Sequence, residues 1–265
     1  MGEARRRFLN RQRTGSPQVF KQELVSKPGK AGVLIAVPSG DGNIRWSLGN
    51  MFAQAQQLNA RPDWPFTYGH MVLAGCSPTD YARNSIVNFF LEKTDCTWLY
   101  MVDADQEAPE NWPFLTMVNG AQVVSGKTYC WVPTGYKEGQ LRVNQYSLDQ
   151  HARCFNITPP ETGGNPYEVP IVGTGCFAVH REVFAKIPMP AFRFAYEPSG
   201  KIRAGEDINF SVACQRAGFK IAVHPSVLFG HVKAVNLANI DEYAEARHKF
   251  IAENRQHLPE SMLSV

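Results

Sequence analysis

The chain has 265 residues, which suits one large domain or two small ones, and 44% of them are apolar, enough for a substantial core. It has no apolar run of about eighteen residues, so we expect no membrane-spanning helix. Its six cysteines are scattered without a C-x-x-C pair, which argues against a zinc site and against a disulfide framework.

Charge is distributed unevenly along the chain. Residues 1–30 carry eight Lys or Arg and two Glu, whereas the other residues carry nineteen basic and twenty-two acidic side chains. We expect a solvated, basic N-terminal segment, with contact to nucleic acid or an anionic membrane surface as the alternative. The segment lacks the apolar stretch of a secretory signal, so the expected location is the cytoplasm, or the host cytoplasm for a phage-encoded protein.

The first half of the chain alternates strand and helix patterns. Short apolar runs rich in β-branched residues predict strands, and apolar residues at helical spacing predict helices. Ser77 is the expected N-cap of the second helix, followed by Pro78 in its first turn. The strands are expected at 31–39, 66–75, 97–103 and 121–130, and the helices at 46–60, 77–93 and 108–120.

The second half is less regular. Residues 131–168 contain Pro, Gly and Asn without a clear period and predict loops and short strands. The later elements are a strand and helix over 169–187, a loop over 188–204, a helix over 205–218 closed by Gly218, a strand over 219–232 and a charged helix over 239–257. The alternation predicts a single α/β domain with a largely parallel sheet flanked by helices, over 31–235, followed by a C-terminal helix and tail over 236–265.

The apolar strand 97–103 ends in the acidic sequence Asp103-Ala104-Asp105. Ligands of open α/β sheets bind outside the carboxyl ends of the strands. In an extended chain residues i and i+2 point the same way, so both carboxylates are expected to converge, and a divalent cation would remove their repulsion. Oxygen ligands suit Mg²⁺ or Mn²⁺. A simple turn after the strand is the alternative, and the neighbouring motifs decide between the two.

Three later motifs accompany this acidic pair. The sequence "GTGCFAVHREVF" offers a glycine-flanked strand, "GEDINF" places Glu206 and Asp207 at a helix start, and "HPSVLFGHV" supplies His224 and His231. Together with the D-x-D, this order resembles the GT-A glycosyltransferases, and the family 2-like enzymes in particular, over roughly residues 31 to 233. The resemblance implies the GT-A fold, a Rossmann-like nucleotide-binding sheet, and a hexosyltransferase-like activity.

The resemblance also implies roles for single residues. Asp105 would be the stronger metal ligand, Asp103 would contact the metal or the donor ribose, and His231 would complete the Mn²⁺ or Mg²⁺ site. His224 is expected to be structural. Pro38 and Ser39 would face the nucleotide, as would Arg83, for which a solvent-facing helix charge is the alternative.

Asp207 is the candidate general base for the acceptor hydroxyl, with Glu206 as its neighbour and an acceptor contact. Helix N-terminal capping is the other reading of both residues, and the two roles are compatible. In a retaining enzyme Asp207 would position substrate instead. The loop 192–207, with Tyr196, Lys201 and Arg203, could order over the donor.

The resemblance implies a nucleotide-sugar donor, and UDP-sugar is favoured over GDP-sugar. Relatives often hold the base with an Asp after the second strand, where this chain has Gly75 and Cys76. The acceptor would be a saccharide, a lipid-linked sugar or the hydroxymethylated DNA of a phage. The alternatives are a non-catalytic carbohydrate- or nucleic-acid-binding module and a sugar-phosphate nucleotidyltransferase, although the loop "PSGDGNIRW" lacks the latter's glycine-rich basic pattern.

Overall fold

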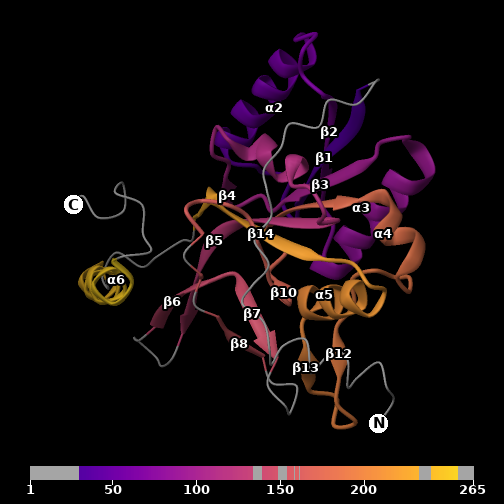
Figure 1. Cartoon of the computed structure of the whole chain (residues 1–265). Coiled ribbons are helices and arrows are strands. Elements are labelled where there is room, and N and C mark those ends of the chain that lie inside the picture. Colours follow the sequence, from indigo (N-terminus) through magenta and orange to yellow (C-terminus); the bar gives the residue numbers. More distant parts are fainter. Residues whose placement is uncertain are drawn as a thin grey trace.

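The structure is a computed structural model that describes residues 30–133, 139–148, 154–157, 159–160, 162–232 and 240–255. The basic segment predicted over 1–30 therefore lies outside the described residues, apart from Lys30. The described chain forms a mixed α/β domain, with one large sheet between helices (Figure 1).

The central sheet has nine strands in the order β2-β1-β3-β11-β5-β14-β4, with β6 paired to β5 and β9 to β14. Strands β1, β2 and β3 are mutually parallel, and β14 is parallel to β5. Between these groups β11 runs antiparallel to both β3 and β5. Five long strands therefore point the same way, which confirms the predicted largely parallel sheet and brings their carboxyl ends to one edge.

The long strands and most of the helices lie at the predicted positions, but the helix expected over 108–120 is a shorter 3-10 helix. The larger strands of the sheet are β1 (Ala31–Ser39), β2 (Phe66–Ala74), β3 (Trp98–Val102), β5 (Val123–Pro133), β6 (Gly139–Val143), β11 (Cys176–His180) and β14 (Ile221–His231). The short ones are β4 (Gln106–Glu107) and β9 (Tyr167–Glu168). The helices are α2 (Trp46–Asn59), α3 (Thr79–Lys93), η1 (Trp112–Met117), α4 (Arg181–Lys186), α5 (Glu206–Arg216) and α6 (Ile240–Asn254).

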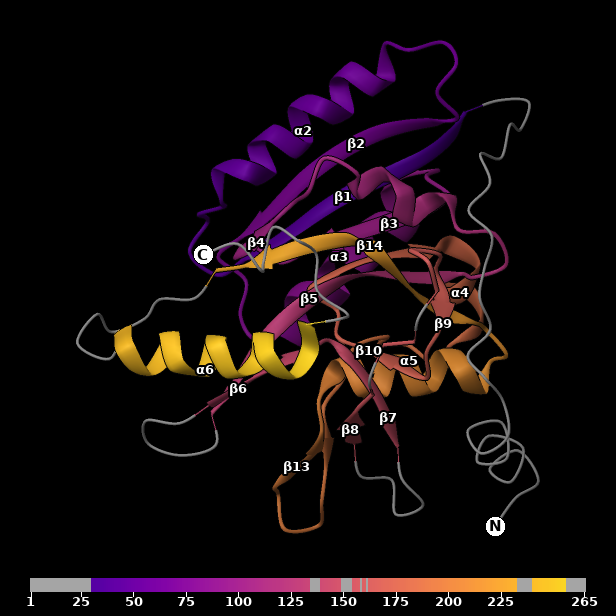
Figure 2. The ribbon, with the colours of Figure 1, turned by 60° about the vertical axis from the view of Figure 1, so that its left-hand side comes forward.

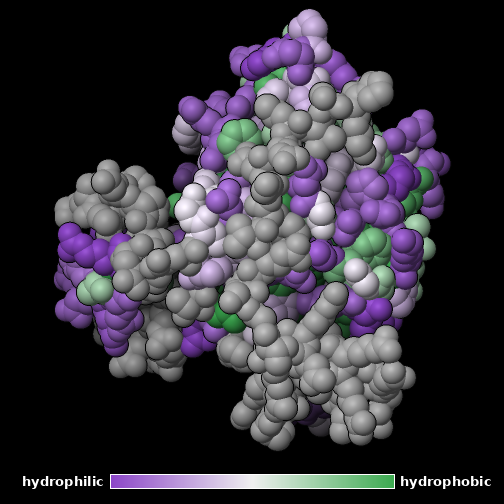
Figure 3. Space-filling view, viewed as in Figure 1, coloured by the Kyte–Doolittle hydropathy of each residue, from purple (hydrophilic) through white to green (hydrophobic). Residues whose placement is uncertain are grey.

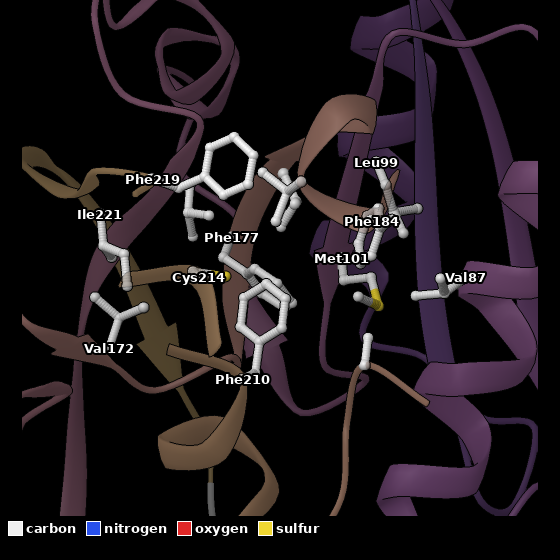
Figure 4. Close-up of a cluster of buried hydrophobic side chains, with 14 of the residues drawn as sticks. Val87, Leu99, Met101, Val172, Phe177, Phe184, Phe210, Cys214, Phe219 and Ile221 are labelled. Atoms are coloured by element: carbon white, nitrogen blue, oxygen red, sulfur yellow. The ribbon is translucent and has the colours of Figure 1, made fainter. Parts of the chain in front are cut away.

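Alternating side chains of the sheet feed two hydrophobic cores, one on each face. On one face Val33 and Ile35 of β1 pack with α2 and η1, where Trp112 is fully buried. On the other face Leu34 packs with α3, α4 and α5, around Phe177 and Phe210 (Figure 4). Successive side chains of a strand point to opposite faces of the sheet, and both faces are covered here. The strands are therefore apolar at nearly every position.

Two local predictions are wrong. Ser77 does not cap α3, because the helix begins at Thr79 after Pro78, and no side-chain cap is formed there. The segment 188–204 is not simply a loop, because β12 (Ala195–Tyr196) and β13 (Ile202–Ala204) form a hairpin that projects beside α5 (Figure 1). These strands are too short to show an alternating pattern in the sequence.

The irregular stretch 131–168 yields short strands, as predicted. Strands β7 (Gln145–Leu148), β8 (Cys154–Asn156) and β10 (Ile171–Val172) form a separate three-stranded sheet. The predicted C-terminal helix is α6, which lies alongside β6 (Figure 2) and places the ring of Phe250 5.2 Å from that of Tyr129.

On the face seen in Figure 3, apolar side chains occur as separate patches among hydrophilic ones. Within the described ranges, no helix combines the length and the apolar character needed to cross a membrane.

Candidate functional site

The D-x-D residues lie at the carboxyl edge of the sheet, directly after β3. The backbone does not stay extended there, because Gln106 N donates to the carbonyl oxygen of Asp103 at 3.0 Å and closes a turn. The extended backbone predicted at Asp103 and Asp105, from which their convergence was expected, is therefore wrong. The two carboxylates instead contact different partners on different elements.

Asp103 pairs with Arg83 of α3. Arg83 Nη2 donates to both carboxylate oxygens of Asp103, at 2.9 and 3.1 Å, and to the carbonyl oxygen of Thr174 at 3.3 Å. Arg83 Nη1 donates to Glu206 Oε1 at the start of α5. Because only 3% of Arg83 is exposed, a solvent-facing helix charge is excluded. The guanidinium predicted to face the nucleotide is occupied by two carboxylates and a carbonyl.

Asp105 pairs with His231 at the end of β14. Asp105 Oδ2 lies 3.3 Å from His231 Nε2, and His231 Nδ1 lies 3.0 Å from the carbonyl oxygen of Tyr129. The backbone supports this contact, since Val232 N donates to the carbonyl oxygen of Asp105 at 2.9 Å. The structure therefore brings together two of the three predicted metal ligands, although they are 126 residues apart in sequence.

Across the ranges that the structure describes, no group of three or more His, Cys, Asp or Glu side chains is gathered as a metal ion would require. Asp105 and His231 form a pair, and Asp103 is held by Arg83. A metal site built from all three residues therefore stays a prediction.

Glycines leave room for the acidic side chains. A Cβ on Gly175 would lie 3.4 Å from Asp103 Oδ2, and one on Gly205 would lie 2.7 Å from Asp207 Oδ1. Glycines beside a strand can let the chain pass close to a ligand. In the structure a Cβ on Gly175 would also lie 3.3 Å from Gln106 Nε2, so this glycine lies against the turn that carries Asp103.

Asp207 is the second residue of α5, and its Oδ1 accepts a hydrogen bond from Ile208 N at 2.7 Å. Burial raises the pKa of the Asp207 carboxyl, and the neighbouring charge of Glu206 raises it further. The charge of Arg83 acts in the opposite direction but does not cancel these effects. A carboxylate with a raised pKa is a stronger proton acceptor, which is what a general base requires.

The predicted nucleotide-facing end of β1 forms a compact polar turn. Ser39 is 2% exposed, and its hydroxyl donates to the carbonyl oxygen of Asn43 at 2.7 Å and to Asp41 Oδ1 at 3.1 Å. Pro38 precedes it and is half-buried. Gly75 N donates to the carbonyl oxygen of Ser39 at 3.0 Å, so the ends of β1 and β2 meet. Asp41 was not expected from the sequence, although its contact is typical of an Asx-turn: Asp41 Oδ1 accepts from the backbone N of Asn43, two residues on, at 2.9 Å.

The β12–β13 hairpin leads directly into α5. Tyr196 and Ile202 are opposite each other in the ladder, and each is 61% exposed. Lys201 and Arg203 are also exposed. The hairpin places these side chains on the segment just before Asp207, and its predicted ordering over a donor stays a prediction.

His224 is structural, as expected from the sequence. It is 1% exposed in β14, and its ring stacks on Phe114 with centroids 6.2 Å apart. Burial lowers the pKa of His224 to about 4. The ring is therefore neutral at pH 7.

This burial predicts a stability loss in acid. In the unfolded chain His224 takes up a proton near its ordinary pKa of 6.5, whereas in the folded chain it does so only near 4. The contribution of the neutral ring to the free energy of unfolding is therefore complete above pH 6.5 and falls as the pH drops from 6.5 to 4. The expected loss between pH 7 and pH 4.5 is about 2.4 kcal/mol, at 1.36 kcal/mol for each unit of pKa. Urea unfolding at pH 7 and pH 4.5 measures it, and His224→Phe should show a smaller loss. An identical loss in both proteins would contradict the prediction.

Comparison with known proteins yields similarity only at the level of solved structures. No protein-family model matches the chain, and no curated protein matches it. The crystal structure of A197 from STIV is 21% identical, with 76% of this chain and 86% of that chain covered and a TM-score of 0.48.

Two further solved structures are similar to the chain at lower scores. The catalytic domain of Drosophila β1,4-galactosyltransferase 7, in complex with xylobiose, is 16% identical over 77% of this chain and 71% of that chain, with a TM-score of 0.42. A glycosyltransferase involved in glycosylation of the major capsid of PBCV-1 is 11% identical over 78% and 98%, with a TM-score of 0.37. At these scores the fold and the site rest on the chain's own geometry.

Proposed function

We propose that the chain is a metal-dependent glycosyltransferase that moves a sugar from a nucleotide-sugar, UDP-sugar in preference to GDP-sugar, to an acceptor hydroxyl. One arrangement carries the proposal: the carboxyl edge of the sheet holds the Asp105–His231 pair, and Arg83 links Asp103 of the same acidic turn to Glu206, the residue directly before Asp207. The first group suits a cation and a diphosphate, and the second suits proton removal.

The donor atoms of the pair fit a divalent cation. The carbonyl oxygen of Tyr129 can only accept a hydrogen bond, so His231 Nδ1 carries the proton that it donates to this oxygen. In the neutral ring Nε2 then has no proton, and its lone pair points toward Asp105 Oδ2. This is the arrangement that orients metal-binding histidines. Asp105 and His231 would hold Mn²⁺ or Mg²⁺, with Asp103 contacting the metal or the donor ribose. When bound, the cation would neutralise charge on the diphosphate leaving group.

Asp207 would take the proton from the acceptor hydroxyl as the sugar is transferred. Its raised pKa supports this role, and its position at the helix start keeps one carboxylate oxygen on Ile208 N. Glu206 directly precedes the proposed base and pairs with Arg83. In this proposal it would also contact the acceptor.

The acceptor would be a saccharide, a lipid-linked sugar or hydroxymethylated DNA of the phage type, and the reaction would take place in the cytoplasm of the cell or of a phage host. A screen of these acceptors with a panel of radiolabelled sugar nucleotides identifies the product. If the chain bound a sugar nucleotide but neither transferred the sugar nor slowly hydrolysed the donor, the result would favour a non-catalytic binding module instead.

Manganese-dependent binding of UDP- and GDP-sugars tests the proposal directly. Asp105→Ala removes a proposed ligand that is 36% exposed in its side chain, so it should fold normally and bind the donor at least about tenfold more weakly in the presence of Mn²⁺. Titration calorimetry measures the affinity, with Asp63→Ala, on an exposed loop, as the control. If wild-type protein binds neither nucleotide-sugar with Mn²⁺ present, the proposed function is wrong.

A further inference from the structure

Arg83 joins three parts of the chain that are distant in sequence. It lies in α3, and its guanidinium reaches Asp103 after β3, 20 residues away, and Glu206 at the start of α5, 123 residues away. The carbonyl oxygen of Thr174, just before β11, is a third acceptor. A guanidinium can make such a set of contacts because its donors lie in one rigid plane.

This guanidinium is closed to a ligand from outside. Arg83 is 3% exposed, and its Nε atom is sealed from solvent. The ring of Phe192 covers it, with the guanidinium carbon 5.9 Å from the ring centroid. Both terminal nitrogens already donate to carboxylates, so a donor phosphate would have to displace Asp103 or Glu206 to reach them.

The contact to Glu206 lies at the first residue of α5. Asp207 follows Glu206 immediately, and Gly205 before it supplies the N-cap without a side-chain hydrogen bond. The first turn of the helix is held locally by Asn209 N, which donates to the carbonyl oxygen of Gly205 at 3.1 Å. In the part of the chain that the structure describes, the Arg83–Glu206 ion pair ties this turn to Asp103 at the end of β3, because Arg83 contacts both carboxylates.

We propose that Arg83 is a positioning residue: it anchors the first turn of α5, and with it Asp207, to the acidic turn after β3, and it is not a ligand of the donor phosphates. The role assigned to Asp207 rests on the proposed function, whereas the anchoring itself does not. The proposal departs from the expectation drawn from the family resemblance, in which Arg83 faces the nucleotide.

Hydrogen exchange followed by mass spectrometry tests the anchoring. Arg83→Lys keeps the charge but cannot bridge two carboxylates and a carbonyl in one plane, so amides of the first turn of α5 should exchange about tenfold faster or more, while the rest of the helix changes less. Arg181→Lys is the matched control. Arg181 also donates to several carbonyl oxygens, including those of Cys96 and Phe90 at 2.7 Å each, but it lies at the other end of β3.

Glu206→Ala provides a second route to the same result, should Arg83→Lys fail to fold. It removes the anchor from the helix side and should also accelerate exchange in the first turn of α5, whereas Glu206→Gln keeps an acceptor for Arg83 and should restore protection to within about threefold of the wild type. Unchanged exchange in Glu206→Ala, or in a folded Arg83→Lys protein, would overturn the anchoring.

Nucleotide binding separates the two roles of Arg83. With Mn²⁺ present, Arg83→Lys should bind UDP or GDP within about threefold of the wild type, while kcat for transfer or donor hydrolysis falls at least about tenfold. A tenfold or greater loss of nucleotide affinity would make Arg83 a donor ligand. If the wild type binds neither nucleotide, the proposed function fails, but the exchange experiment still decides whether Arg83 anchors α5.

Discussion

Asp207→Asn is expected to lower the rate of sugar transfer by about 10²–10⁴-fold, the usual contribution of a general base. The amide keeps an oxygen to accept from Ile208 N, and Gly205 leaves room for it, so the start of α5 should not change. Donor affinity should stay within about threefold of the wild type, because the substitution removes proton transfer and leaves the proposed diphosphate site intact.

Steady-state kinetics and calorimetry together measure this split, with Asp63→Asn at an exposed position as the control that should transfer at the wild-type rate. The wild-type rate should also fall in acid at a pH above the ordinary range of an Asp carboxyl, because burial and Glu206 raise the pKa of Asp207. Transfer by Asp207→Asn at the wild-type rate would remove Asp207 from the role of base.

The long elements of the fold could be predicted because burial on both sides leaves a strong local pattern. β1 was expected at residues 31–39 and forms over Ala31–Ser39, with Val33 to Val37 buried. The hairpin β12–β13 was missed because its two strands have two and three residues, fewer than an alternating pattern needs.

The site could be predicted as a set of residues but not as a set of contacts. The position of Asp105 after an apolar strand and the late His231 were visible in the sequence, and they do meet. The pairing of Arg83 with Glu206 was not visible, because no local pattern links residues 123 apart. The turn at Asp103 depends on β11, since Asp103 N donates to the carbonyl oxygen of Gly175 at 2.8 Å, and strand pairing of that kind is a tertiary property.

The same buried ion pairs predict a large stability effect at Arg83. Arg83→Met leaves the carboxylates of Asp103 and Glu206 without their guanidinium, and their side chains are only 32% and 14% exposed. Removing one partner of a buried pair costs about 3–5 kcal/mol, because the remaining charge keeps its desolvation penalty. We therefore expect the free energy of unfolding, measured by urea denaturation at pH 7, to fall by about that amount.

Neutralising the two carboxylates that Arg83→Met leaves unpaired should recover most of the lost free energy of unfolding. The triple variant Arg83→Met, Asp103→Asn, Glu206→Gln removes the charges of both carboxylates that Arg83 pairs with, and neutral replacement of buried ion pairs is often without net cost. Arg181→Met is the comparison: the acceptors that lose their donor are uncharged, namely backbone carbonyls and the hydroxyl oxygen of Thr94, so its cost should be smaller, about 1–3 kcal/mol. The explanation by unpaired carboxylates would be wrong if Arg83→Met were no less stable than Arg181→Met. It would also be wrong if the triple variant were no more stable than Arg83→Met. The packing of Arg83 against Phe192 would then be the remaining physical cause of the stability loss.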